Sequence, residues 1–138
     1  MADIIYTSFK KDIMNGAIDL DTDTIKVMLV TSAYTASATH AKRSDITNEV
    51  TGTGYTAGGA TLASATVTNV STNGVFDAND VAWTTSTITA RGAVLYKSRG
   101  GASSADELIC YLDFTADKVS TAGTFTIAWN ASGILNLA

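Results

Sequence analysis

Hydrophobic residues first recur along the chain at the spacing of a helix. Ile5, Phe9 and Ile13 lie four residues apart, so all three fall on one face of a helix. Gly16 follows them, and glycine commonly ends a helix because it accepts the left-handed conformation. The pattern therefore predicts a short helix over residues 4–15.

Beyond this segment the spacing changes from four to two. Ile25, Val27 and Leu29 alternate with a more mixed set of residues, which is typical of a strand with at least one buried face. Comparable short extended runs follow along the rest of the chain. We predict strands within residues 24–31, 46–50, 60–70, 75–76, 81–83, 88–97, 108–114, 124–129 and 134–137.

Turns and loops separate these runs. Asn73 and Gly74 stand between two extended runs, and this dipeptide favours a tight hairpin turn because both residues tolerate a positive φ. Gly92 lies inside a run, which predicts a β-bulge. Residues 32–59 hold the fewest apolar side chains, so we expect a long loop there that contains only the short strand at 46–50.

The predicted elements define a fold class. Short strands with turns about every 8 to 12 residues indicate a mainly β protein, an antiparallel β-sandwich or barrel of jelly-roll type rather than a βαβ fold. The chain has 22 threonine residues, and β-branched side chains favour strands. No internal repeat or change in composition divides the sequence. We therefore predict a single β domain over residues 1–138 with a short N-terminal helix.

The composition narrows the classes of function. Hydrophobic residues make up 46% and the net charge is only -4, a balance that favours a folded chain over a disordered one. Nine Lys and Arg residues in a chain of pI about 4.7 do not form the basic surface that nucleic acid requires. No run approaches the roughly 18 apolar residues of a membrane span, and the first residues lack the pattern of a secretion signal. We expect no nucleic-acid or membrane partner, and synthesis in a cytoplasm.

The sequence is also short of the residues that protect sheet edges. It contains no proline, and charged residues make up only 16% of it. Monomeric β proteins commonly use proline or charged side chains such as lysine to keep edge strands from pairing with other chains. A β protein with few of these residues is expected to have edges and faces that other subunits cover. The composition therefore points toward assembly.

Two acidic runs are candidates for a metal site. Residues 19–23 carry aspartate at alternate positions, as a calcium-binding EF-hand loop does at its start. Such a loop needs glycine at its sixth position and a bidentate carboxylate at its twelfth, where this chain has Thr24 and Val30. Residues 77–80 have the composition of an ordinary turn. We therefore predict solvated turns and no metal site.

The remaining motifs do not support an enzyme. Residues 52–57 fit the dinucleotide-binding fingerprint, but that motif must open a helix and this one continues into a strand. His40, the single histidine, lies in a polar loop. Cys110, the single cysteine, alternates with Leu108 and Leu112, which indicates a small buried hydrophobic residue on the same side of a strand. We expect no catalytic residue, no cofactor and no internal disulfide.

Four runs of the sequence carry a resemblance to a known family. They are residues 15–32 (NGAIDLDTDTIKVMLVTS), 51–59 (TGTGYTAGG), 89–96 (TARGAVLY) and 125–135 (FTIAWNASGIL). Together they resemble a family of small structural virion proteins of tailed bacteriophages, and the resemblance covers nearly the whole chain. It brings no catalytic residues with it. It implies an assembly component made in the host cytoplasm, and the size suggests a capsid decoration or cement protein on the capsid surface of the virion.

The resemblance also implies partners. They are the major capsid protein and copies of the chain itself, as a homo-oligomer in the assembled particle. A surface rich in threonine and poor in charge has a low desolvation penalty when it is buried against such a partner. The N-terminal segment with Ile4, Ile5, Tyr6 and Phe9 either docks on a neighbouring subunit as an arm or packs on its own sandwich, and the sequence favours the second.

Two alternatives stay open at this point. The same resemblance allows a structural protein of the tail, neck or connector. The second alternative is a β-sandwich that binds host glycans through aromatic side chains in the middle loops, with Tyr34 and Tyr55 as the candidates.

Overall fold

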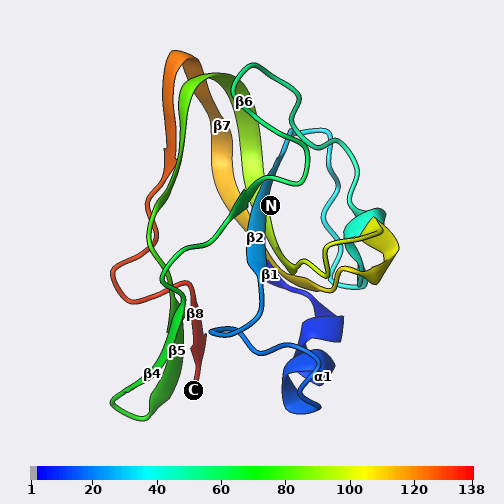
Figure 1. Ribbon diagram of the computed structural model, residues 1–138, viewed down its shortest axis with the longest axis vertical. Helices are drawn as coiled ribbons and strands as arrows, with labels where there is room; N and C mark the ends of the chain where they lie inside the picture. Colours follow the sequence, from blue (N-terminus) through cyan, green and yellow to red (C-terminus); the bar gives the residue numbers. More distant parts are fainter. Residues whose placement is uncertain (1–2) are drawn as a thin grey trace.

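Two antiparallel sheets and one short helix make up the protein (Figure 1). The computed structural model describes residues 3–138, so the first two residues of the predicted domain lie outside it. The larger sheet has the strand order β1-β7-β6-β2-β3 and the smaller one β4-β5-β8. The predicted mainly β class and its sandwich-like arrangement are confirmed.

The elements have the following bounds. The helix α1 spans Thr7–Met14, and two short 3-10 turns span Arg43–Asp45 and Ser103–Ala105. The strands are β1 (Ile4–Ile5), β2 (Ile25–Val30), β3 (Ala60–Thr61), β4 (Thr66–Val70), β5 (Asn73–Asp77), β6 (Val81–Lys97), β7 (Leu108–Ile127) and β8 (Leu135–Leu137).

One long hairpin forms the frame of both layers. β6 has 17 residues and β7 has 20, whereas the sequence predicts four separate strands there. In Figure 1 the paired strands rise in one layer, bend over and descend in the other. Trp83 and Phe125 from one arm therefore share a core with Val27 and Leu29 of β2. The main hydrophobic core thus lies between the two arms of the same hairpin.

β2 is buried on both of its faces. Val27 and Leu29 face the core between the layers, whereas Met28 and Val30 belong to a second cluster on the opposite face. That second face is covered by the loop that follows β2, which carries Tyr34 into the cluster. A strand covered on both sides needs a continuous apolar run, which explains why residues 27–30 of β2 are all hydrophobic.

The bend in the hairpin is made by irregular strand pairing. The register between β6 and β7 shifts between Trp83 and Ser86, and again between Ser86 and Ile88. Thr85 and Ala122, one on each strand, have φ values of 49° and 47° at these shifts. A bulge bends its strand and increases the local twist. Two bulges on opposite strands close together therefore turn the ribbon sharply.

A buried pair of hydroxyl groups satisfies the backbone that the bend leaves unpaired. The oxygens of Ser86 and Ser120 lie 2.8 Å apart. Ser86 Oγ also lies 3.0 Å from the Trp83 carbonyl and 3.1 Å from the Gly123 carbonyl, and the Ile88 N–H donates to Ser120 Oγ. Since carbonyls only accept and a hydroxyl has one proton, Ser86 shares its single proton between the two carbonyls, and Ser120 donates to Ser86. The pair therefore relays hydrogen bonds from an amide to two carbonyls.

A third shift in register lies at Gly92, where the sequence predicts a bulge, but the bulged strand is β7 and not β6. The pairing changes between Ala90 and Gly92, where β7 has extra residues that include Thr115 with a φ of 65°. A Cβ atom at Gly92 would lie 2.4 Å from the Tyr111 ring. Glycine is required here because the ring packs directly on the backbone.

The N-terminal helix is shorter than predicted. α1 spans Thr7–Met14 rather than residues 4–15. The preceding Ile4–Ile5 pairs antiparallel with Tyr111 and Cys110 of β7 instead of continuing the helix. This pairing covers part of an edge strand that would otherwise leave its backbone groups open.

The position of one hairpin turn is also corrected. Asn73 and Gly74 do not form the turn between β4 and β5, because Asn73 pairs with Val70 inside the ladder. Ser71 and Thr72 form the turn, and Ser71 takes the positive φ of 57° that the sequence assigned to the asparagine and glycine. Gly74 therefore lies within β5, where the absence of a side chain leaves open space on the surface of the smaller sheet.

Leu108 and Cys110 do not share one side of β7 as predicted. Cys110 is paired with Leu95 and Leu108 with Tyr96, so Ile109 is an extra residue in the ladder. This bulge sends Leu108 into the second cluster and Cys110 into the main core. A single inserted residue reverses the side of every residue beyond it.

We expect Ser86→Ala to lower the free energy of unfolding by about 1–3 kcal/mol, since it leaves buried carbonyls without a donor. Urea unfolding would measure this, with the exposed Ser44→Ala as the matched control near wild-type stability. Ser120→Ala should destabilise as well, and the double variant should lose less than the sum of both. Strictly additive losses would contradict the relay.

Candidate interaction surface

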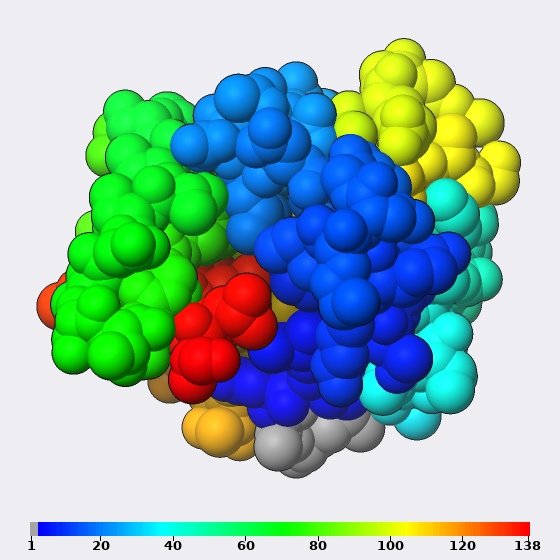
Figure 2. All heavy atoms as spheres, turned by 90° about the horizontal axis from the view of Figure 1, so that it is seen from below, coloured from blue at the N-terminus to red at the C-terminus, as the bar shows by residue number. Residues whose placement is uncertain are grey.

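An apolar groove of about 400 Å³ lies between α1 and the smaller sheet. Figure 2 shows the hollow between the blue N-terminal segment, the green strands and the red C-terminal residues. The helix side contributes Phe9, Ile13 and Met14, because these positions fall on one face of α1. We call this feature the groove.

The pairing of the smaller sheet sets the opposite wall. Phe76 is paired with both Val67 and Leu135, and Gly74 is paired with Leu137. Paired residues lie on the same face of a sheet, and so do residues two apart along a strand. All five therefore face the groove. A Cβ atom at Gly74 would meet nothing within 4 Å, so this glycine forms open floor.

Exposed aliphatic side chains gather around the groove. The described structure leaves six large hydrophobic side chains exposed, and four of them line the groove. They are Ile5, Met14, Val67 and Leu137, of which Met14 is 85% and Leu137 71% exposed. Single exposed aliphatic residues are ordinary on a protein surface, whereas a contiguous patch is typical of an interaction site.

The four predicted interaction residues of the N-terminal segment differ in their exposure to solvent. Tyr6 is fully buried and Phe9 nearly so, and Ile4 is half-buried against the second cluster. Ile5 is 43% exposed and lies with Phe9 on the groove. The segment thus packs on its own sheets while one side chain remains available to a partner.

Tyr34, another predicted interaction residue, lies in the interior. Its hydroxyl is 3.0 Å from the Tyr6 hydroxyl and 2.9 Å from Nδ1 of His40, and its ring meets the Tyr111 ring edge-on. Burial raises the pKa of Tyr34 and, together with the hydrogen bond to Tyr34, that of Tyr6. His40 therefore has a tyrosine partner that its polar sequence neighbours did not reveal.

Tyr55, the remaining candidate, is half-buried and links the loop at Glu49 to β2 through its hydroxyl group. Its hydroxyl donates to Glu49 Oε2 at 2.6 Å and accepts the Leu29 N–H at 3.0 Å, and its ring packs on Trp83. Glu49 makes an isolated bridge to β2. Residues 46–50 are therefore a loop with one bridging residue and not the predicted strand.

The glycine-rich loop at 52–57 and its continuation pack tightly against the strands. A Cβ atom at Gly54 would lie 2.8 Å from the Cα of Ser86, at the bend of the long hairpin. One at Gly59 would lie 1.8 Å from the Val27 carbonyl oxygen, and Gly59 has a φ of 79°. These glycines allow close approach of two backbones, which accounts for the motif that resembled a nucleotide loop.

The two acidic runs form turns and hold neighbouring segments. Asp23 closes the 19–23 turn by accepting the Asp19 N–H at 2.8 Å, and it pairs with Lys97 at 2.8 Å. Asp80 accepts the Trp129 N–H at 2.9 Å and so ties the chain after β7 to the turn before β6. In both runs, aspartate side chains thus hold the turn or a neighbouring segment in place.

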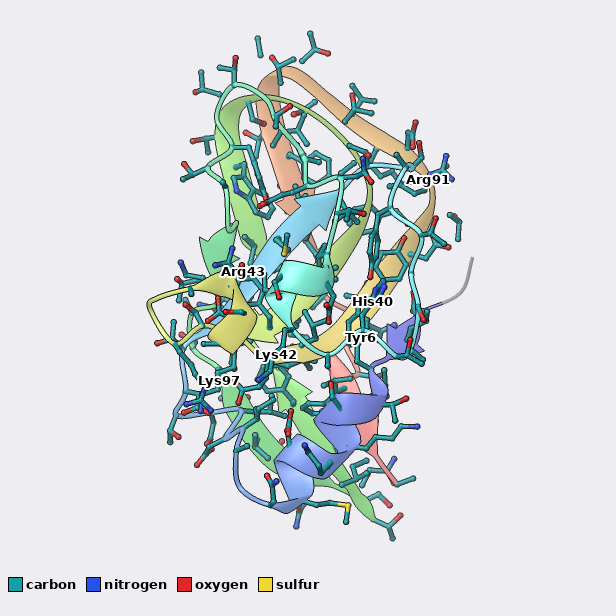
Figure 3. All side chains as sticks on the ribbon, turned by 90° about the vertical axis from the view of Figure 1, so that its right-hand side faces the viewer. Tyr6, His40, Lys42, Arg43, Arg91 and Lys97 are labelled. Carbon is teal, nitrogen blue, oxygen red and sulfur yellow. The ribbon has the colours of Figure 1, made fainter. Side chains whose placement is uncertain are left out.

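Three ion pairs stabilise the end of the long hairpin where β6 connects to β7: two join it to other segments and the third lies within the connecting loop. Arg43 and Lys97 lie on the same side of the molecule (Figure 3). The pairs are Arg43–Asp106 at 2.8 Å, Lys97–Asp23 at 2.8 Å and Arg99–Glu107 at 2.6 Å. The carboxylates of Asp106 and Glu107 are almost wholly buried, so their partners matter more than those of surface charges.

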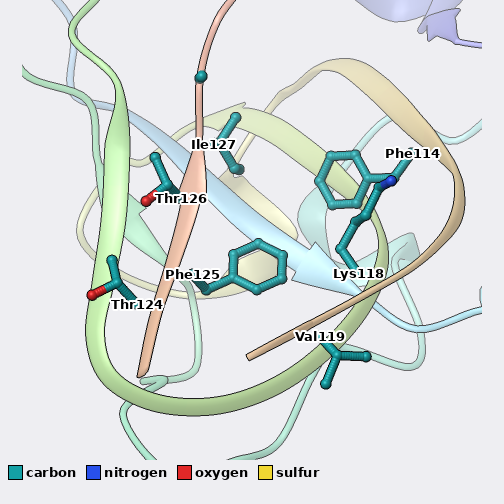
Figure 4. A pocket seen from close by; sticks show the side chains of 8 residues that line it. Phe114, Lys118, Val119, Thr124, Phe125, Thr126 and Ile127 are labelled. Atoms are coloured by element: carbon teal, nitrogen blue, oxygen red, sulfur yellow. The ribbon is translucent and has the colours of Figure 1, made fainter. Parts of the chain in front are cut away.

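A second hollow of about 330 Å³ lies between the two arms of β7 (Figure 4). The side chains of Phe114, Phe125 and Ile127 meet there, with the two aromatic rings 6.4 Å apart, and Lys118 lies at the side. Phe125 and Ile127 are core residues. The hollow is therefore the open side of the main core, with Val119 as its exposed hydrophobic side chain.

The described residues contain neither a recognisable metal cluster nor a helix that could span a membrane. No three His, Cys, Asp or Glu side chains among them gather as a metal site would need. No helix within residues 3–138 is both long and apolar enough to cross a membrane. No protein-family model, curated protein or solved structure matches the chain.

Several carboxyl groups are more acidic in the folded chain than in an unfolded one. The hydrogen bond from Arg99 lowers the pKa of Glu107. Backbone N–H donors lower the pKa of Asp45 and Asp113. A lowered folded-state pKa stabilises the fold above the unfolded value, and this stabilisation is lost as the pH falls through the folded one.

We therefore expect the urea midpoint to be steady from pH 7 to about pH 5 and to fall below about pH 4, near the ordinary pKa values of Asp and Glu. Glu107→Gln should lower the midpoint at pH 7 and reduce the loss on acidification, because the neutral amide cannot titrate. Unfolding curves at several pH values would test this. Parallel pH profiles for wild type and variant would rule out the Glu107 contribution.

Proposed function

We propose that this chain is a bacteriophage virion structural protein, namely a capsid decoration or cement protein that binds and stabilises the shell of the major capsid protein. The observation that carries the proposal is the apolar groove with its exposed aliphatic side chains. A patch of this kind on a folded β protein suits contact with another protein. The resemblance of the sequence to phage virion proteins supports a capsid partner.

The sheet edges support association with copies of the chain as well. β4 is an edge strand in the smaller sheet, and all five of its residues are exposed. It has no proline and no charged residue, which are the usual protections of an exposed edge. On a particle surface, neighbouring subunits would cover this edge, and many weak contacts together give strong attachment.

The fold suits a protein made and assembled in the host cytoplasm. Its single cysteine, Cys110, is buried in the main core, and burial raises the pKa of its thiol to about 12. A protonated, enclosed thiol is a poor nucleophile and a poor partner for a disulfide. The chain thus relies on its packed core and ion pairs for stability.

The geometry favours a protein partner over a host glycan. Tyr34 is buried, and Tyr55 has its hydroxyl bonded to Glu49 and its ring on Trp83. Neither tyrosine presents a free aromatic face in the way that a sugar-binding platform would. A tail, neck or connector position uses the same kind of protein contact and differs in copy number.

We expect shells that lack this protein to lose resistance to heat or chelator, and purified protein added back to restore it. A scanning-fluorimetry or light-scattering melt of the shells, with and without the protein, would measure the effect. Quantitative mass spectrometry of virions should give copies comparable in number to the major capsid protein. Small multiples of three, five or six per virion would assign the chain to the tail or neck instead, and equally robust bare shells would exclude a cement role.

A further inference from the structure

We propose that the groove binds an extended segment of the capsid protein, which adds as a strand to the free edge of β8 and sets an acidic side chain against Lys10. The inference rests on the proposed function for the identity of the partner and deepens it by defining the chemistry of the contact.

The free edge of β8 is the first step of the argument. β8 ends the smaller sheet, with β5 on one side and no further strand on the other within the described residues. Leu135, Asn136 and Leu137 all line the groove, although neighbouring side chains of a strand point to opposite faces. The groove therefore runs along the whole of this edge strand. An extended peptide there would pair with the open backbone groups, as in strand addition.

The side-chain pattern of the occupant follows from the walls. On the sheet side Phe76 and Leu137 face the groove around the open floor at Gly74, and on the helix side Phe9 and Ile13 face it. A strand added to β8 would direct every second side chain into this apolar space. Those alternate residues must be hydrophobic, while the others face solvent.

Charge complementarity fixes a further property of the occupant. Lys10 is the single charged side chain that lines the groove, and it has no ion-pair partner among residues 3–138. Filling the groove would remove water from this ammonium group, which is unfavourable unless a negative group replaces the water. The bound segment therefore carries an aspartate or glutamate at the Lys10 end. Lys11, by contrast, is 75% exposed beside Asp12 and does not line the groove.

Two substitutions and two matched controls test the inference by sedimentation with shells purified without the protein. Gly74→Val fills the floor at a strand position with no positive φ, so it should weaken shell binding at least tenfold while the fold stays at least as stable. Gly101→Val, in open space in a loop, should bind as wild type. Lys10→Glu should weaken binding and Lys11→Glu much less, with the difference shrinking as salt is raised.

A photo-crosslinking residue at the exposed Asn136 would identify the occupant. The expected product joins β8 to one extended capsid segment with alternating hydrophobic residues and a nearby carboxylate. A crosslink to a helix of the capsid protein, or to a second copy of this chain, would overturn the inference. So would unchanged binding of both Gly74→Val and Lys10→Glu to shells that bind wild type. Shells that do not bind wild-type protein would refute the proposed function itself, and the inference with it.

Discussion

The buried hydrogen bond between Ser86 and Ser120 holds the bend on which the architecture depends. A long two-stranded ribbon has no core of its own, because each face meets solvent. Folding the ribbon over brings its two arms face to face, so that Trp83 and Phe125 pack against β2. A bend of this kind frees backbone groups in the interior, where an unpaired group is unfavourable. The two hydroxyls remove that penalty and let a single hairpin supply both layers.

The groove exists because the bend places its two walls on opposite layers. α1 is attached to the first arm through β1, which pairs with β7 near Tyr111, and through the Tyr6 N–H that donates to the Ile109 carbonyl. The smaller sheet continues from the far ends of the same two strands, because β5 leads into β6 and β7 leads to β8. The separation of the walls is therefore set by the angle of the bend, far from the groove itself.

Sequence patterns predicted the elements that depend on local alternation. β2 was predicted correctly, because Ile25, Val27 and Leu29 alternate without interruption. The long strands were divided in two because bulges, such as the one at Thr85, break the alternation. The helix was extended over Ile4–Ile5 because these residues fit its spacing, while a distant edge of β7 decides their pairing. The groove could not be predicted from local patterns, because its walls depend on strand pairings between residues far apart in the sequence. Only Ile5 and Phe9 of its lining were among the predicted interaction residues.

The pairing of the long hairpin also orders the steps by which the chain folds. Tyr96 and Leu108 are close along the chain, whereas Val81 and Ile127 at the far ends are well separated, and loop closure is less favourable over longer segments. We expect the arm beside the connecting loop to form early, the bend next and the smaller sheet last. β8 joins Phe76 from a still more distant position. The groove is then complete only in the finished fold, so a partner that requires it would select fully folded subunits.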